Sequence, residues 1–374
     1  MASQDETFMG VAVAMARRGL GQVWPNPAVG AVLVSNDTTR QVVARGWTMP
    51  GGRPHAEAEA LRRAGERAKN ATLYVTLEPC AHQGVTPPCV DSIIAAGVTR
   101  VVCGVQDPDS RVCGRGVEKL RAAGIEVELG VLEDRALEVT LGHVLRVTHN
   151  RPQICLKLAI GSDGLVAPGD GAPIWVTDEL ARARGHLMRA RADAILVGRG
   201  TIAADNPALS CRLPGMEHRS PVRVVLDSNL LIPRDARVMG TASDIPTWIC
   251  CSSDASDERR SAIRAAGAET IEIKRRQDGL LDPASVAAAL AERGITRLLI
   301  EGGPSVAGSF LEAGIINDVV IFQGQMAAGD TGLQPFGTAG AEQLANSDTF
   351  QRVERRSIGR DSMTRYKTKI SQKQ

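Results

Sequence analysis

Aromatic side chains are scarce in this sequence of 374 residues, since Phe, Trp and Tyr together make up only 3% of it. Its hydrophobic cores must therefore be built mainly from Val, Leu, Ile and Ala. A strong net charge is missing as well, because 44 basic and 42 acidic side chains leave a formal net charge of +2. A nucleic-acid-binding protein usually carries a basic domain or an aromatic-rich basic stretch. We therefore expect no nucleic-acid partner.

Long apolar runs are also absent, and no stretch is long enough to span a bilayer. Residues 1–6 are acidic and lack the basic start and the apolar run of a signal peptide. The eight cysteines do not form the dense pattern of a disulfide framework. These absences predict a protein of the reducing cytoplasm without a membrane partner.

The length is sufficient for two or three domains, and an apolar fraction of 43% is ordinary for a globular protein. Strands and helices alternate along the chain, which predicts the α/β class, with a sheet covered by helices. The stretch 149–152 has the character of a boundary, so we expect domains over 1–148 and 149–374. In the first domain we expect helices over 7–19, 54–68, 88–96, 115–123 and 132–148, a hairpin of strands over 28–35 and 41–46, and strands over 71–77, 98–105 and 125–130.

One imidazole and two thiols in the first domain are suitable zinc ligands: His55, Cys80 and Cys89. Zinc prefers nitrogen and sulfur in a tetrahedral shell, and three protein ligands leave the fourth position to water, as in catalytic sites. Glu57 lies two residues from His55, close enough to reach that water without being a ligand. A His-x-Glu…Pro-Cys pattern is the signature of zinc-dependent nucleobase deaminases, although here a loop over 81–88 separates the two cysteines. The pattern therefore predicts one catalytic Zn²⁺ per chain.

Other interpretations of these residues remain open. Buried cysteine is often only a small hydrophobic residue, and a lone histidine is usually structural. The zinc could instead be purely structural, with His82 as its fourth ligand. In that case the chain would be a zinc-stabilised scaffold whose second half merely binds a nucleotide.

The expected zinc ligands come from places where strands end and helices begin. Cys80 follows the strand over 71–77, while His55 and Cys89 lie in the first turns of their helices. Helix N-termini carry partial positive charge, which favours a thiolate. We therefore expect the ligands to meet at one end of the sheet, where α/β enzymes usually bind their ligands.

A rigid turn, Trp24-Pro25-Asn26-Pro27, precedes the first strand. The side-chain amide of Asn26 could bind a pyrimidine edge. Asparagine is equally an ordinary turn residue, and the sequence does not decide between the two.

The second domain contains a Gly-Gly pair between a strand over 297–300 and a helix that runs to residue 312. Backbone N–H groups and the helix dipole favour an anion at such a junction, which predicts a phosphate site at Glu301-Gly302-Gly303-Pro304-Ser305. Further strands are expected over 153–160, 194–197, 222–226, 247–251 and 271–274, and further helices over 177–191, 255–266 and 283–293.

The motifs occur in the order of a known family. The first half carries Asn26-Pro27, His55-Ala56-Glu57, Thr76-Leu77-Glu78-Pro79-Cys80 and Thr86-Pro87-Pro88-Cys89. The second half carries Leu156-Lys157-Leu158-Ala159, Trp175-Val176-Thr177, Thr201 with Asp205 and Pro207, Leu226-Asp227-Ser228 and Glu301-Gly302-Gly303-Pro304. With these motifs the chain resembles the bifunctional riboflavin-biosynthesis deaminase–reductase family over nearly its whole length.

The resemblance implies a cytidine-deaminase-like three-layer α/β/α domain followed by a dihydrofolate-reductase-like α/β domain. It implies zinc-dependent deamination of a diaminopyrimidinone that carries a phosphoribosylamino group, and then reduction of the ribosyl group to ribityl by NADPH. We expect a small-molecule substrate and a homo-oligomer, either a dimer or a tetramer.

The family's functional residues map onto matching positions of this chain. His55, Cys80 and Cys89 would hold zinc, and Glu57 would transfer protons. The residues that would border NADPH are Ala159, Trp175, Thr201, Asp205, Ser228, Gly303, Pro304, Ser305, Val306, Ala307, Gly308 and Ser309. Those that would contact substrate are Asn26, Pro173, Arg189, Leu209, Arg212 and Glu301.

The chain departs from the family pattern at Val85, Gly161, Pro173 and Asn206. Three of these positions lie in the reductase half, so one alternative is a deaminase whose reductase half has decayed. The other is a deaminase of nucleic-acid bases with an unrelated second domain, which would share the zinc signature.

Overall fold

The computed structural model describes residues 3–85, 87–110, 112–166, 176–336 and 348–369. The chain divides into two compact units, Met1–Arg151 and Pro152–Gln374. None of the described helices has the length and apolar character needed to cross a bilayer.

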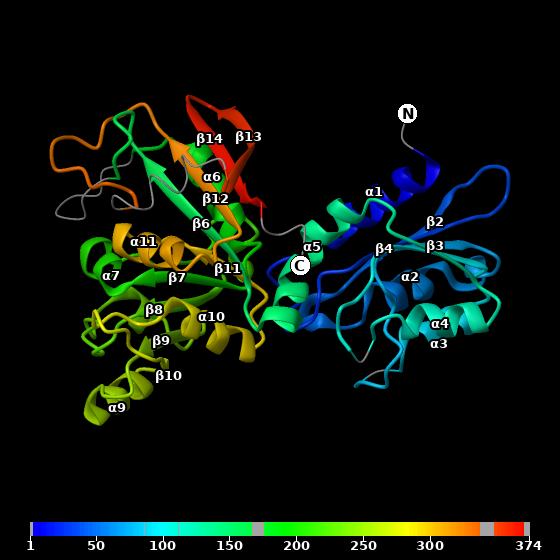
Figure 1. The fold of residues 1–374 in the computed structure, drawn as a ribbon, viewed down its shortest axis with the longest axis horizontal. Helices are drawn as coiled ribbons and strands as arrows, with labels where there is room; N and C mark the ends of the chain where they lie inside the picture. Colours follow the sequence, from blue (N-terminus) through cyan, green and yellow to red (C-terminus); the bar gives the residue numbers. More distant parts are fainter. Residues whose placement is uncertain (1–2, 86, 111, 167–175, 337–347, 370–374) are drawn as a thin grey trace. The chain divides into compact units, whose positions relative to one another are not determined.

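The first unit is a mixed sheet covered by helices on both faces (Figure 1). Its strand order is β2-β1-β3-β4-β5, in which β1 runs antiparallel to β2 and β3, while β3, β4 and β5 are parallel. Helices α1 and α5 cover one face, and α2, α3 and α4 cover the other. The elements are α1 Gln4–Ala16, β1 Gly30–Val34, β2 Val42–Trp47, the 3₁₀ turn η1 Pro50–Gly52, α2 Ala56–Ala64, the 3₁₀ turn η2 Gly65–Ala68, β3 Thr72–Leu77, α3 Cys89–Ala95, β4 Arg100–Val105, α4 Arg115–Ala122, β5 Glu126–Leu129 and α5 Glu133–His149.

The central strands form because their sequences are apolar on both faces. All residues of β1 and β3 are buried, as a strand between two helical layers requires. The predicted hairpin is confirmed, since β1 pairs antiparallel with β2. The helix expected over 54–68 differs in detail: α2 stops at Ala64, because Gly65 adopts a positive φ of 56°, and η2 follows.

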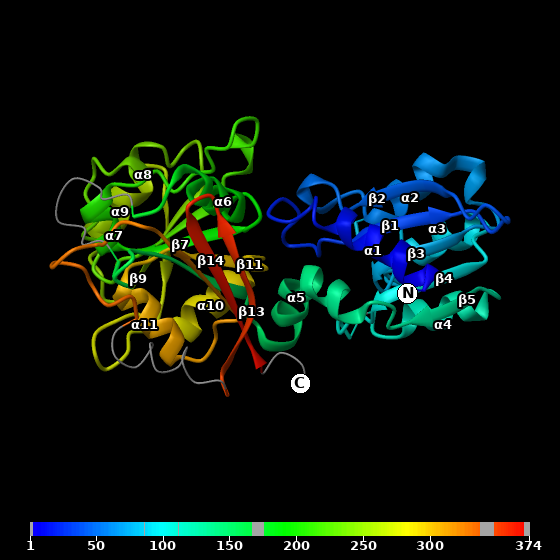
Figure 2. The ribbon, with the colours of Figure 1, turned by 90° about the horizontal axis from the view of Figure 1, so that it is seen from above.

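The second unit is a sheet with the strand order β10-β9-β8-β7-β11-β6-β12-β14-β13. The strands from β10 to β12 in this order are parallel, and β14 and β13 add an antiparallel edge. In Figure 2, α6, α8 and α9 lie on one side of the sheet, while α10 and α11 lie on the other. The elements are β6 Gln153–Ile160, α6 Glu179–Arg189, β7 Ala194–Gly198, α7 Arg199–Asp205, the 3₁₀ turn η3 Glu217–Arg219, β8 Val222–Leu226, α8 Arg237–Gly240, β9 Thr247–Cys251, α9 Asp257–Ala265, β10 Glu269–Glu272, α10 Pro283–Glu292, β11 Arg297–Ile300, α11 Pro304–Glu312, β12 Asp318–Gln323, β13 Phe350–Ile358 and β14 Asp361–Thr368.

Some of these elements were not expected from the sequence. The segment after β7 forms the short helix α7, where no helix was expected. The strands β12, β13 and β14 extend the sheet beyond β6, where no strand was expected. The carboxyl ends of the parallel strands still lie together, and this is the edge at which open α/β sheets bind ligands.

Candidate active sites

The first site is a cluster of three ligating side chains in the first unit. His55 is the N-cap residue of α2, Cys80 follows β3, and Cys89 is the first residue of α3. Their ligand atoms all lie within 4.8 Å of one another. The fold therefore brings together the three residues that the sequence singled out as zinc ligands.

The separations in this cluster fit a tetrahedral zinc shell. Nδ1 of His55 lies 3.4 Å from Sγ of Cys89 and 3.8 Å from Sγ of Cys80. Zn–N and Zn–S bonds of about 2.0 and 2.3 Å at tetrahedral angles put neighbouring ligand atoms about 3.6 Å apart. The donor set and its spacing thus fit Zn²⁺ bound through the Nδ1 nitrogen of His55.

The surroundings of Cys80 favour its thiolate form. Its pKa is lowered to about 4, mainly by hydrogen bonding from Cys89 and also by the His55 ring. The backbone N–H of Cys89 donates to the Cys80 sulfur over 3.3 Å. A thiolate is the form of cysteine that binds a metal.

Glu57 lies beside the cluster, in the first turn of α2, and is almost completely buried. Burial is the main reason why the pKa of Glu57 is raised to about 7. Its side chain lines a cavity of about 130 Å³ together with His55 and Cys80. A carboxyl group in this position can exchange a proton with a molecule bound in the cavity.

Asn26 lines the same cavity, so the turn residue lies where it can meet a ligand. Gly52 makes this placement possible: its φ is 82°, and a Cβ there would lie 1.9 Å from Nδ2 of Asn26. A side chain at position 52 would therefore displace Asn26 from the cavity wall.

Glu78 fixes the loop after β4, whose residues Asp107, Asp109 and Val112 line the cavity. Its carboxylate accepts hydrogen bonds from the backbone N–H groups of Asp107, Gly114, Gly116 and Val117. Gly116 has to be glycine, because a Cβ there would lie 2.3 Å from the carbonyl oxygen of Pro79. The Glu78-Pro79-Cys80 segment is thus tied to the start of α4 as well as to the cluster.

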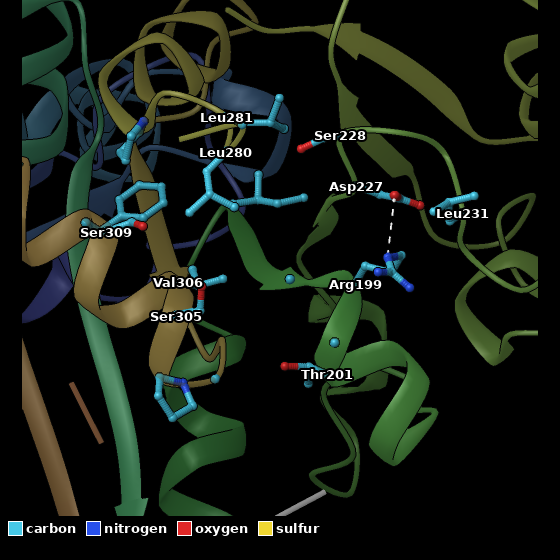
Figure 3. Close-up of a pocket in the computed structure, with 18 of the residues that line it drawn as sticks. Arg199, Thr201, Asp227, Ser228, Leu231, Leu280, Leu281, Ser305, Val306 and Ser309 are labelled. Atoms are coloured by element: carbon cyan, nitrogen blue, oxygen red, sulfur yellow. Dashed lines mark ion pairs between the residues drawn. The ribbon is translucent and has the colours of Figure 1, made fainter. Parts of the chain in front are cut away.

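The second site is a cavity of about 610 Å³ in the second unit (Figure 3). Arg199 and Thr201 of α7 lie on one side of it, and Ser305 and Val306 of α11 lie on the other. The carboxyl ends of β7 and β8 supply its floor. The predicted cofactor residues that line the cavity are Thr201, Asp205, Ser228, Gly303, Pro304, Ser305, Val306 and Ser309.

The remaining predicted cofactor residues lie elsewhere. Ala159 is in β6, Ala307 is on the buried face of α11, and Gly308 packs against the backbone of Phe336. Trp175 and Pro173 lie outside the described residues.

A compact charge cluster follows β11 in the second unit. Arg189 of α6 donates two hydrogen bonds of 2.9 Å to the two carboxylate oxygens of Glu301. Nζ of Lys157, on β6, lies 3.6 Å from the same carboxylate. Burial alone would raise the pKa of Glu301, but the charges of Arg189 and Lys157 outweigh it and lower the pKa to about 2.

Arg212 and Leu209 lie on the segment after α7. The backbone N–H of Arg212 donates to Nδ1 of His186 over 3.3 Å, while Leu209 is buried with a positive φ of 52°. Burial, followed by the charges of Arg189 and Arg212, lowers the pKa of His186 to about 4. The imidazole is therefore neutral at pH 7, and the side chain of Arg212 is exposed.

Several residues of these sites were not singled out from the sequence. Asp107 and His143 line the first cavity, and Arg275 and Leu280 line the second. Lys157 was noted only as part of a motif. No short motif marks these positions, since the topology alone brings together the ends of different elements.

The fold and the two sites define a class of protein. The first unit has the fold and the ligand cluster of a zinc-binding deaminase domain of the cytidine deaminase type, and the second is a reductase-type α/β domain.

Comparisons with known proteins agree with that class. Residues 2–105 match the zinc-binding region of cytidine and deoxycytidylate deaminases, and residues 152–362 match the RibD C-terminal domain. The riboflavin biosynthesis protein RibD of Aquifex aeolicus is 37% identical over 97% of this chain and 98% of its own, and that of Escherichia coli is 36% identical over 96% and 98%.

Solved structures are similar over the same length. RibD of Acinetobacter baumannii has a TM-score of 0.85 at 32% identity, covering 98% of this chain and 99% of its own. A deaminase/reductase of Thermotoga maritima has a TM-score of 0.83 at 35% identity, covering 97% and 98%. The chain belongs to the RibD family of riboflavin biosynthesis proteins, which are enzymes that join a deaminase and a reductase in one chain. The predicted family, fold class and bifunctional activity are thereby confirmed.

Proposed function

We propose that the chain catalyses two successive steps of riboflavin biosynthesis. The first is the zinc-dependent hydrolytic deamination of 2,5-diamino-6-(5-phosphoribosylamino)pyrimidin-4-one. The second is the NADPH-dependent reduction of the ribosyl side chain of 5-amino-6-(5-phosphoribosylamino)uracil to ribityl. The observation that carries the proposal is the cluster of His55, Cys80 and Cys89 with the buried Glu57 beside it. The similarity to the Thermotoga maritima protein, a diaminohydroxyphosphoribosylaminopyrimidine deaminase and 5-amino-6-(5-phosphoribosylamino)uracil reductase, also supports it.

The deamination replaces an amino group of the ring with an oxygen from water. Bound zinc supplies Lewis acidity, which brings the pKa of a water towards about 7. Glu57 accepts a proton from the attacking water, passes it to a ring nitrogen and assists the departure of ammonia. Asn26, on the cavity wall, holds the ring by its amide.

The reduction requires no metal in the second unit. NADPH held by the residues of the larger cavity would supply a hydride for the carbonyl or imine carbon of the opened sugar, and a proton must reach the heteroatom bonded to that carbon. The ammonium group of Lys157, held beside Glu301, is a suitable proton donor. The cofactor's phosphates would meet the backbone N–H groups at the start of α11, where the helix dipole favours anions.

The substrate phosphate is better matched to Arg212 than to Arg189. The side chain of Arg189 is only 15% exposed, and its guanidinium fork is occupied by the two oxygens of Glu301. Its role is therefore to hold Glu301 in place. Arg212 binds the phosphate, and the neutral His186 fixes its backbone.

We also propose that the chain is a cytoplasmic homo-oligomer, a dimer or a tetramer. Light scattering of the purified protein tests the assembly, and a monomer over a hundredfold range of concentration would contradict it.

The deaminase assignment is tested most simply without NADPH. The zinc-loaded protein is given the phosphoribosylaminopyrimidine, and ammonia release is followed. One ammonia per substrate is expected. Zinc-loaded protein that releases none, while a tRNA or a single-stranded DNA is deaminated, would favour the nucleic-acid alternative.

A further inference from the structure

The wall of the deaminase cavity contains a buried carboxylate–imidazole pair beyond the zinc ligands. Nε2 of His143, on α5, lies 3.1 Å from Oδ1 of Asp107, which follows β4. Both side chains are only 9% exposed, and both line the cavity that also contains His55 and Glu57.

The hydrogen bond determines which nitrogen of His143 is free. Asp107 already accepts the backbone N–H of Asp109 over 2.9 Å, so its carboxylate takes a donor from the ring as well. A neutral imidazole that donates from Nε2 presents Nδ1 as an acceptor. Nδ1 is buried and has no hydrogen-bond partner among the described residues. A buried polar atom in a native site is normally paired, so a bound molecule is expected to supply the missing donor.

Both residues of the pair lie outside the segment that matches the zinc-binding region of known deaminases. The zinc-binding region shared with cytidine and deoxycytidylate deaminases ends at residue 105, before both Asp107 and His143. Asp107 lies on the loop after β4, and His143 lies on α5. Neither belongs to the zinc ligand cluster, and both line the cavity, so both are available to contact a bound ring.

The cavity has a volume of about 130 Å³, and His55, Glu57, Asp107 and His143 all line it. The lining side chains that do not belong to the zinc cluster, Asp107 and His143 among them, are available to meet the substituents of a bound ring. In the proposed substrate these include the exocyclic 5-amino group, an N–H donor that cytosine lacks.

We propose that His143 is a positioning and specificity residue of the deaminase half. Its Nε2–H holds the Asp107 carboxylate in place, and the carboxylate and Nδ1 together accept hydrogen bonds from the exocyclic amino groups of the pyrimidine. This inference rests on the proposed function, because it takes the diaminopyrimidinone as the ligand.

The test compares His143→Phe, which keeps a ring without polar atoms, with His143→Gln, whose amide can still donate to Asp107. His149→Phe on the same helix is the matched control, since His149 is exposed. For each variant we would measure kcat and KM of ammonia release, zinc content, and reduction of the already deaminated substrate. The free bases 2,5,6-triaminopyrimidin-4-one and 2,6-diaminopyrimidin-4-one would be measured as competitive inhibitors of the wild type and of each variant.

His143→Phe is expected to raise KM about 10- to 100-fold, the cost of losing a buried hydrogen bond and leaving its partner unpaired. It should also abolish the wild-type preference for the base that carries the 5-amino group. His143→Gln should recover most of the affinity, and the control should match the wild type. Zinc content and reduction should stay unchanged in all variants.

An unchanged KM and an unchanged preference in His143→Phe would overturn the inference, as would a loss of zinc. If His143→Phe does not accumulate, Asp107→Asn serves the same purpose, and wild-type affinity and preference in that variant would overturn it equally. A wild type that releases no ammonia would instead contradict the proposed function, so the two failures are distinguishable.

Discussion

Arg189 and Glu301 form a largely buried bidentate ion pair that joins α6 to the end of β11, with two N–O distances of 2.9 Å. The pair contributes to the stability of the second unit and also holds the candidate site residue Glu301 in place. Removing Arg189 leaves the Glu301 carboxylate with Lys157 alone, 3.6 Å away, and breaking a buried ion pair by removing one partner typically costs about 3–5 kcal/mol.

Arg189→Ala is therefore expected to lower the stability of the second unit by about 3 kcal/mol and to raise the KM of the reduction step. Ammonia release should remain intact. Calorimetry together with separate assays of the two steps checks this, with Arg352→Ala on the exposed edge strand β13 as the control. Loss of deamination alone in Arg189→Ala would contradict the assignment of the two activities to separate units.

The contribution of the Arg189–Glu301 pair should also be visible in how the unfolding free energy of the second unit depends on pH. The pKa of Glu301 is lowered to about 2 in the folded protein, against an ordinary value of 4.5. A lowered pKa stabilises the folded state above pH 4.5, and this stabilisation is lost as the pH falls towards 2. The difference corresponds to about 3 kcal/mol.

Glu301→Gln should consequently reduce the unfolding free energy of the second unit most at pH 5 and above. The difference in unfolding free energy between the wild type and the variant should narrow steadily between pH 4.5 and 2. Urea unfolding at several pH values measures this difference. If the difference instead widens as the pH falls, the Glu301 carboxyl is protonated in the folded state.

Glu57→Gln is expected to keep zinc and to slow ammonia release by about 10²- to 10⁴-fold, the usual contribution of a positioned acid–base group. Glu59→Gln, in the same turn of α2, is the matched control, because Glu59 is bound to Arg62 and Arg63 instead of lining the cavity. Metal analysis and the ammonia assay distinguish the two variants. Near-wild-type turnover in Glu57→Gln would mean that another group carries the proton.

Ser305→Asp introduces a negative charge at the start of α11, on the wall of the larger cavity. Like charges about 5 Å apart repel by roughly 3 kcal/mol at an effective dielectric constant of about 20. The dissociation constant of NADPH should therefore rise about tenfold or more, whereas deamination is unaffected. Ala313→Asp at the other end of the helix is the control, and equal effects of the two would remove the case for a phosphate site there.

The zinc cluster could be predicted from sequence because its chemistry is concentrated in short motifs. His55 and Glu57 are two residues apart, and each cysteine follows a proline at the start or end of an element. Strand and helix junctions then determine where these residues lie, and the predicted junctions after β3 and before α3 are confirmed.

Other parts of the molecule depend on contacts that no local pattern reveals. His143 lies 36 residues from Asp107, and Lys157 lies 144 residues from Glu301, so only the tertiary fold brings each pair together. Charged and apolar residues alternate only weakly along β13 and β14. Most residues of β13 are exposed, because this strand lies at the edge of the sheet. A sequence pattern that reflects burial cannot identify a strand that buries little.

The most direct test of the two-step function is one assay that follows ammonia and NADPH together. Zinc-loaded protein receives the phosphoribosylaminopyrimidine and NADPH, and a parallel sample is first stripped of metal with a chelator. We predict ammonia release followed by an equal amount of NADPH oxidation, with both lost after chelation and oxidation alone restored by adding the deaminated substrate. Ammonia release without any NADPH oxidation would contradict the second step, and neither signal from the zinc-loaded protein would contradict both.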